Sequence, residues 1–122
     1  MDVSDIKLLQ TIYYILASST SIRKRMALYE FKSFLLAELR NRGIRIDLID
    51  EEQHLFAANN QVLLFFPRNN QDEHEILVIL MEILIPYAET YVIAYAIQNK
   101  QGACIIRFEL PDDFVSSHEK GK

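Results

Sequence analysis

The stretch 91-YVIAYAIQNKQGACIIRFEL-110 decides the fold class, because it holds two apolar runs on either side of a polar turn. β-Branched and aromatic residues are typical of strands, and the turn Asn99 to Gly102 predicts that two strands meet as a hairpin. If this turn pairs Gln98 with Ala103, one face of the hairpin is core, made of Tyr91, Ile93, Tyr95, Ile97, Cys104, Ile106, Phe108 and Leu110. The opposite face then holds Val92, Ala94, Ala96, Ile105, Arg107 and Glu109.

Three further strands are predicted upstream of the hairpin. Ile44 to Leu48 alternates apolar with charged residues, which is the pattern of a half-buried strand. Leu55 to Ala58 and Val62 to Phe66 flank the turn signal Asn59-Asn60. Together the three runs predict an antiparallel meander.

Helical patterns fill the remaining chain. A first helix is expected from Ser4 to about Ser18, with its buried face at Ile6, Leu9, Ile12, Tyr13 and Leu16. A second should run from Ile22 to Arg42 and end at Gly43. A third, from Asp72 to Ile85, is apolar nearly all round and should end before Pro86.

These elements predict an α+β fold, an antiparallel sheet of about five strands with two N-terminal helices and one central apolar helix, in the order ααβββαββ. We expect residues 1–113 to form a single domain and residues 114–122 to be a flexible C-terminal tail.

The composition narrows the function classes. The 122 residues carry a formal net charge of -4, which argues against a protein that works on nucleic acid or on an anionic membrane. The single cysteine, Cys104, permits no internal disulfide and no cluster of zinc-bound thiolates, so a reducing, cytoplasmic location is expected. The acidic start Met1 to Asp5 is unlike a secretory signal, and the apolar run Ile76 to Met81 falls well short of the ~20 residues that span a bilayer.

One segment is basic within this acidic chain. Clustered Lys and Arg are what a nucleic-acid backbone or an acidic protein would require, and the alternative is a solvated helix face paired with the chain's own acids. The candidate residues for binding an anionic partner are Arg23, Lys24, Arg25, Lys32, Arg40, Arg42 and Arg45.

The sequence contains no recognisable set of catalytic or metal-binding residues. The acids Asp47, Asp50, Glu51 and Glu52 could ligate a divalent cation, and a nuclease of the restriction-endonuclease kind also has a helix that leads into a meander. Such a nuclease needs an acid-x-lysine on the next strands, whereas residues 54–66 contain no carboxylate and no lysine. The three histidines are far apart in the sequence, and with three glycines no phosphate-binding glycine loop is present. No catalytic residue, metal or cofactor is therefore assigned.

The order of helices and strands in this small acidic chain resembles the layout of type III secretion chaperones. That resemblance is topological, and it implies a dimer that binds an extended stretch of a client protein.

The sequence favours a non-catalytic protein-interaction module, an adaptor, chaperone-like binder or regulatory subunit that acts as a homodimer. The expected dimer interface contains Val92, Ala94, Ala96 and Ile105, with Arg107 and Glu109 able to pair across the axis. Two alternatives remain open, a nucleic-acid-binding protein that uses the basic helix 22–45 and an enzyme whose site has no local signature.

Overall fold

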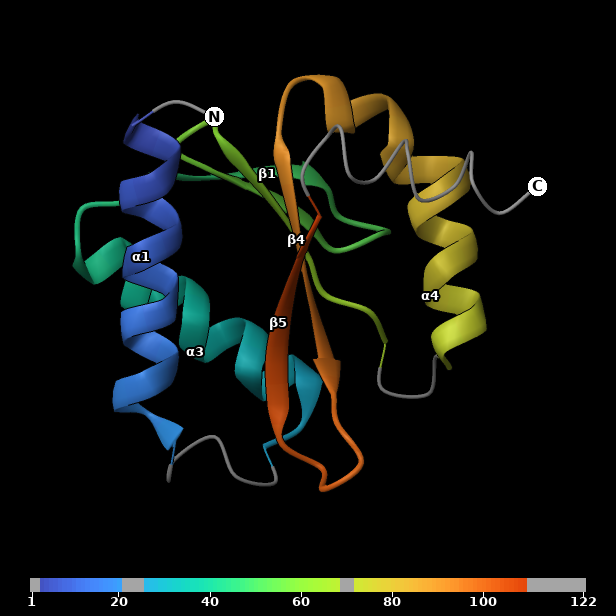
Figure 1. The fold of residues 1–122 in the computed structure, drawn as a ribbon, viewed down its shortest axis with the longest axis horizontal. Coiled ribbons are helices and arrows are strands. Elements are labelled where there is room, and N and C mark those ends of the chain that lie inside the picture. Colours follow the sequence, from blue (N-terminus) through green and yellow to red (C-terminus); the bar gives the residue numbers. More distant parts are fainter. Residues whose placement is uncertain (1–2, 21–25, 69–71, 110–122) are drawn as a thin grey trace.

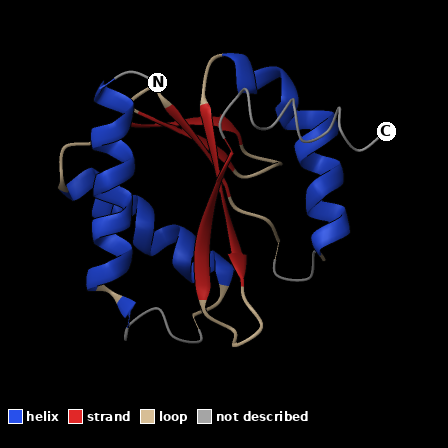
Figure 2. Cartoon of the chain, viewed as in Figure 1, coloured by secondary structure: helices blue, strands red, loops and turns tan. Residues whose placement is uncertain are grey.

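The computed structural model describes residues 3–20, 26–68 and 72–109, and it arranges them in three layers, with a β-sheet between two layers of helices (Figures 1 and 2). In chain order the elements are α1 (Val3–Ser18), α3 (Leu28–Asn41), β1 (Ile46–Asp50), β2 (Leu55–Ala58), β3 (Val62–Phe65), α4 (Glu73–Ile79), the π-helical turn η1 (Leu80–Leu84), the 3₁₀ turn η2 (Ile85–Glu89), β4 (Val92–Gln98) and β5 (Cys104–Glu109). The predicted α+β class and element order are confirmed. The predicted tail, residues 114–122, lies outside the described residues.

The sheet is mixed, so the prediction of a purely antiparallel sheet was wrong. Its five strands lie in the order β1-β2-β3-β4-β5, and β1, β2 and β3 form the predicted antiparallel meander. The next pair, β3 with β4, is parallel, and β5 returns antiparallel to β4. Parallel neighbours need a crossover connection, and the segment from α4 to η2 provides it across one face of the sheet.

The last hairpin differs from its predicted register by one residue. Gln98 pairs with Cys104 and not with Ala103. The Gly102 N–H donates to the Asn99 carbonyl at 2.9 Å, and Gly102 has φ +83°, a left-handed conformation that glycine adopts at little cost. The Asn99 N–H in turn donates to the Ala103 carbonyl at 2.9 Å, so the turn takes in one more residue than the sequence suggested.

This slip moves every residue of β5 to the other face relative to β4. Val92, Ala94 and Ala96 now share a face with Cys104, Ile106 and Phe108, and this face packs on α1 and α3. Ile93, Tyr95 and Ile97 share the other face with Ile105 and Arg107, toward α4. Both faces of β4 are core, which is usual for a strand between helix layers.

Helix α1 buries a different set of residues from the one predicted. In α1 the buried residues are Leu8, Ile12 and Ile15, whereas Ile6 and Tyr13, expected inside, are 44% and 56% exposed. Helix α3 begins at Leu28, after the N-cap Ala27, and the predicted start at Ile22 lies outside the described residues. Its end before Gly43, which has φ +81°, agrees with the prediction.

The apolar helix begins where predicted but does not end at Pro86. The Asp72 side chain caps α4 by accepting from the Glu75 N–H at 2.8 Å. Beyond Ile79 the chain passes into the π turn and then the 3₁₀ turn, where Pro86 lies in the first turn and needs no N–H partner. The segment has a buried side and an open side, since Leu77 and Met81 are 44% and 42% exposed.

Two turns of the meander use left-handed backbone at residues other than glycine. Asn59 and Asn60, with φ of 49° and 56°, are the central residues of the turn between β2 and β3, in which the Gln61 N–H donates to the Ala58 carbonyl at 3.0 Å, and asparagine tolerates this conformation. His54, with φ 56°, closes the turn between β1 and β2, where its N–H donates to the Glu51 carbonyl at 3.2 Å. A left-handed conformation costs an ordinary L-residue about 1 to 2 kcal/mol.

We predict that Leu80→Ala lowers the free energy of unfolding by about 2 to 5 kcal/mol, because Leu80 is 2% exposed and its removal leaves a cavity against the sheet. The adjacent Met81→Ala is the control and should cost less than about 1 kcal/mol. Urea unfolding of both variants measures the difference. Equal losses would contradict the packing of this segment on the sheet.

We predict that His54→Gly is more stable than His54→Ala by about 1 kcal/mol, because both remove the imidazole but only glycine accepts the left-handed backbone without strain. Chemical denaturation of the two variants isolates the backbone contribution. A more stable alanine variant would show that residue 54 is unstrained.

Candidate interaction surface

The two edge strands of the sheet differ in how they are protected. The pairing of β1 with β2 shifts register between Leu48 and Asp50, and the acids Asp47 and Asp50 lie on this strand. Bulges and charged residues are common protections of an edge against further pairing. The pairing of β5 with β4 runs without interruption from Ile93 with Glu109 to Gln98 with Cys104. The β5 edge is therefore the more regular template for another strand.

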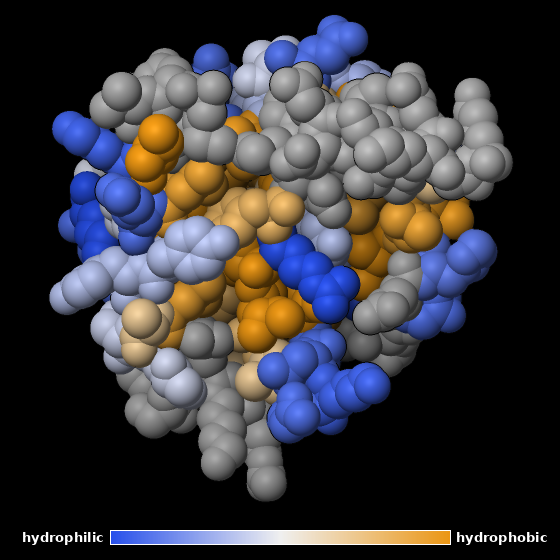
Figure 3. Space-filling view, viewed as in Figure 1, coloured by the Kyte–Doolittle hydropathy of each residue, from blue (hydrophilic) through white to orange (hydrophobic). Residues whose placement is uncertain are grey.

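Apolar side chains flank β5 on both sides. On the α1 side, the ring of Tyr13 lies 5.1 Å from that of Phe108, and Tyr13 is 56% exposed. On the α4 side, a shallow groove of about 160 Å³ runs between the helix and the sheet, lined by Ile76, Leu77, Leu80, Tyr95, Ile97 and Arg107. Figure 3 shows hydrophobic residues gathered in the middle of this face, between the helix layers, where Figure 1 places β5. We call β5 with Tyr13 and Leu77 the β5 edge surface.

Three of the six residues predicted for a dimer interface are buried in the core. Val92 is 6% exposed, and Ala94 and Ala96 are fully buried, because α1 and α3 cover their face. The expectation that this face is open was wrong, and a carboxylate placed at Ala94 would be buried in the core and destabilise the fold. Ile105 is half-buried on the α4 side.

The two charged residues of the predicted interface lie on β5. Arg107 is exposed and lines the groove beside α4. Glu109 is the last residue of β5 and pairs with Ile93 through the backbone. Arg107 and Glu109 therefore lie on an edge strand of the sheet. The apolar residues Val92, Ala94 and Ala96, predicted beside them, lie in the core.

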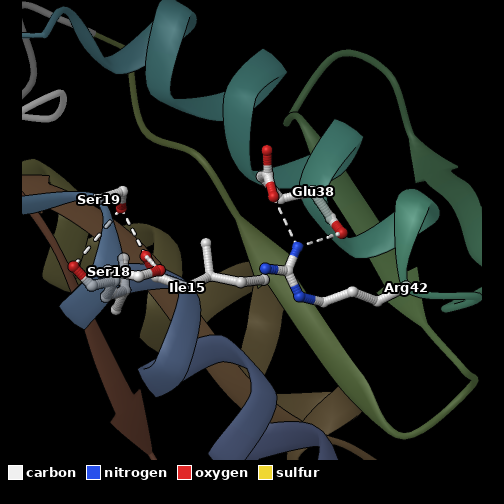
Figure 4. A network of polar contacts seen from close by, with 6 residues as sticks. Ile15, Ser18, Ser19, Glu38 and Arg42 are labelled. Atoms are coloured by element: carbon white, nitrogen blue, oxygen red, sulfur yellow. Dashed lines mark hydrogen bonds and ion pairs between the residues drawn. The ribbon is translucent and has the colours of Figure 1, made fainter.

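The described basic residues do not form one patch. Arg42 pairs with Glu38 on its own helix at 2.6 Å, and it also donates to the Glu38 carbonyl (Figure 4). Arg45 pairs with Asp47 at 2.8 Å, near the turn between β2 and β3. Lys32 lies by the turn at the other end of β2, with its Nζ 3.4 Å from His54 Nδ1.

Within the described residues, the rest of the predicted basic set is represented by Arg40. Arg40 is exposed in the last turn of α3. Arg23, Lys24 and Arg25 lie outside the described residues. Arg42 and Arg45 each form an ion pair with a nearby carboxylate.

Reasoning from sequence missed the surroundings of His54. Burial lowers the pKa of this imidazole below its ordinary value, and the positive charges of Lys32 and Arg68 lower the pKa further. Glu51 partly opposes this shift. The three basic residues come from α3, from the turn after β1 and from the chain after β3, so no local motif joins them. The one local signal is that the turn 51–54 ends with a histidine where glycine or asparagine would fit better.

The thiol of Cys104 lies in the core. Cys104 is buried, and its Sγ donates to the Met26 carbonyl at 3.0 Å, as expected for a core thiol. Within residues 3–20, 26–68 and 72–109, no three His, Cys, Asp or Glu side chains gather closely enough to hold a metal ion. In the same ranges no helix has the length and hydropathy to cross a membrane.

No family model, no curated protein and no solved structure matches this chain.

Proposed function

We propose that this chain is a non-catalytic protein-interaction module that works as a homodimer, in which β5 of one copy pairs antiparallel with β5 of a second copy. The observation that carries the proposal is the uninterrupted β5 edge with exposed apolar side chains on both of its sides. Strand addition satisfies the free backbone groups of an edge and gives affinity through main-chain hydrogen bonds.

The symmetry of such a pair suits the arrangement of layers in one copy. A twofold axis perpendicular to the sheet sets two identical strands antiparallel and keeps each helix layer on its own side of the joined sheet. The α1 layer of one copy then continues into the α1 layer of the other, and the α4 layers do the same. Tyr13 and Phe108 would come together across the axis on one side, and Leu77 would be covered on the other.

The alternative edge supports association less well. Leu48 and Ile49 on β1 are 55% and 37% exposed, but the irregular pairing beside them breaks the backbone ladder. The edge β1 also carries Asp47, whose carboxylate is 2.8 Å from Arg45 Nε. Two β1 edges would bring these acids near each other, which disfavours pairing.

We predict that the wild-type protein sediments with a mass near twice 14.3 kDa at micromolar concentration and that Tyr13→Glu shifts the mass toward one copy. Tyr29→Glu is the matched control, because Tyr29 is also a helical tyrosine, 62% exposed, but belongs to α3. Sedimentation equilibrium gives the mass, and circular dichroism checks that both variants remain folded. A wild type that stays monomeric throughout this range would contradict the proposal.

We also predict that Leu77→Glu weakens the dimer about tenfold or more, since a carboxylate would be desolvated in the interface. Leu48→Glu is the control on the opposite edge, where Leu48 is 55% exposed. Dissociation constants from dilution series measure both effects. A loss confined to Leu48→Glu would assign the interface to β1 and overturn the use of β5.

A further inference from the structure

A depression of about 210 Å³ lies where the start of α3, the turn between β1 and β2 and the end of β3 meet. Its floor is apolar and is formed by Leu28, Phe66 and Pro67, which are all buried. Its rim carries Lys32, His54 and Arg68. The depression is on a different part of the molecule from the β5 edge surface, because none of its lining residues belongs to α1, α4 or β5.

The charge in this depression is opposite to the charge of the chain. The sequence has 17 acidic residues against 13 Lys and Arg, yet no lining residue of the depression is acidic. In the described part of the chain, Lys32 has no carboxylate within ion-pair distance, and its Nζ contacts an imidazole and lies 6.0 Å from the centre of the Phe56 ring. The positive charges of Lys32 and Arg68 beside an apolar floor favour a ligand with one anionic end.

The imidazole has a defined role in this geometry. An ammonium group can only donate, so the 3.4 Å contact from Lys32 Nζ makes His54 Nδ1 the acceptor. The proton of the neutral ring then sits on Nε2, which is a third donor. The left-handed φ of His54 is energetically unfavourable for a residue other than glycine. Residues with such backbone strain are common at binding sites.

We propose that Lys32, His54 and Arg68 form a binding site for a small organic oxyanion, a carboxylate or phosphate group attached to an apolar body that lies on Phe66 and Pro67. The Lys32 ammonium and the Arg68 guanidinium neutralise the anion, and His54 Nε2 donates to it. The floor excludes water from one side of the ligand, which strengthens each charged contact.

A second depression adds a negative charge on one side of the site. It measures about 200 Å³, adjoins the first through His54, Phe66 and Arg68, and contains Glu52. The Glu52 carboxylate repels an anion from that side, so the anionic group is confined to the Lys32 side. The anionic group of the ligand is therefore expected beside Lys32 and away from Glu52.

The first experiment is calorimetric titration of the full chain at neutral pH with phenyl phosphate and, separately, with benzoate. These two probes distinguish a phosphate ligand from a carboxylate ligand, and inorganic phosphate shows what the apolar body adds. Binding of either aromatic anion more tightly than inorganic phosphate supports the site. No binding of either at millimolar concentration would overturn it.

A matched pair of variants separates this site from general attraction of anions. Lys32→Met and Arg40→Met each remove one positive charge from α3, but only Lys32 lines the depression. Lys32→Met should weaken binding about tenfold or more, because a charge-assisted hydrogen bond is lost, and Arg40→Met should leave it nearly unchanged. Equal effects of the two variants would overturn the assignment.

The titration of His54 provides a second readout that does not depend on affinity. The groups that act on its pKa are Lys32 and Arg68, which lower it, and Glu51, which raises it, while Glu52 lies in the adjoining depression. A bound anion stabilises the protonated ring, so benzenesulfonate, which keeps its charge in this range, should raise the pKa of His54 measured by NMR. An unchanged pKa of His54 at saturating benzenesulfonate would place the anion elsewhere.

Discussion

The parallel pairing of β3 with β4 is the constraint on which the rest of the structure depends. Both strands are buried on both faces, from Val62 to Phe65 and from Val92 to Ile97. Each fully buried aliphatic or aromatic side chain contributes about 1.5 to 3 kcal/mol, so uncovering either face would unfold the sheet. The parallel direction also forces the chain between the strands to cross one face, and that crossing is the helical segment that covers it.

Local patterns predicted the elements well, because apolar spacing, turns and caps act within a few residues. The hairpin turn Asn59-Asn60 and the cap Asp72 are examples, since each satisfies backbone groups beside it. The direction of β4 relative to β3 could not be derived in the same way. It depends on the path of the chain between the two strands, and no pattern within residues 91–98 encodes that path. The register of β5 depended on the conformation of Gly102, and one residue at that turn decided which face every later side chain joined.

The functional surfaces were harder to predict than the elements, for a related reason. Charges adjacent in the sequence drew attention to residues 22–45, but Arg42 and Arg45 lie beside carboxylates that neutralise them. Lys32, His54 and Arg68 are far apart in sequence, and only the fold brings them around one depression. Val92, Ala94 and Ala96 do not form an open face, because helices cover both faces of the sheet.

The π turn in the crossover segment determines which of its side chains face the sheet. Ile76, Leu80 and Leu84 pack in one cluster with the residues of the sheet and recur at every fourth position. In an uninterrupted α-helix, four residues advance about 40° beyond a full turn, so a stripe with this repeat would wind gradually away from the sheet. The wider π turn from Leu80 to Leu84 takes more residues per turn and offsets that drift. The segment therefore tolerates neither the loss nor the gain of one residue here, because either change would rotate Leu84 out of the core.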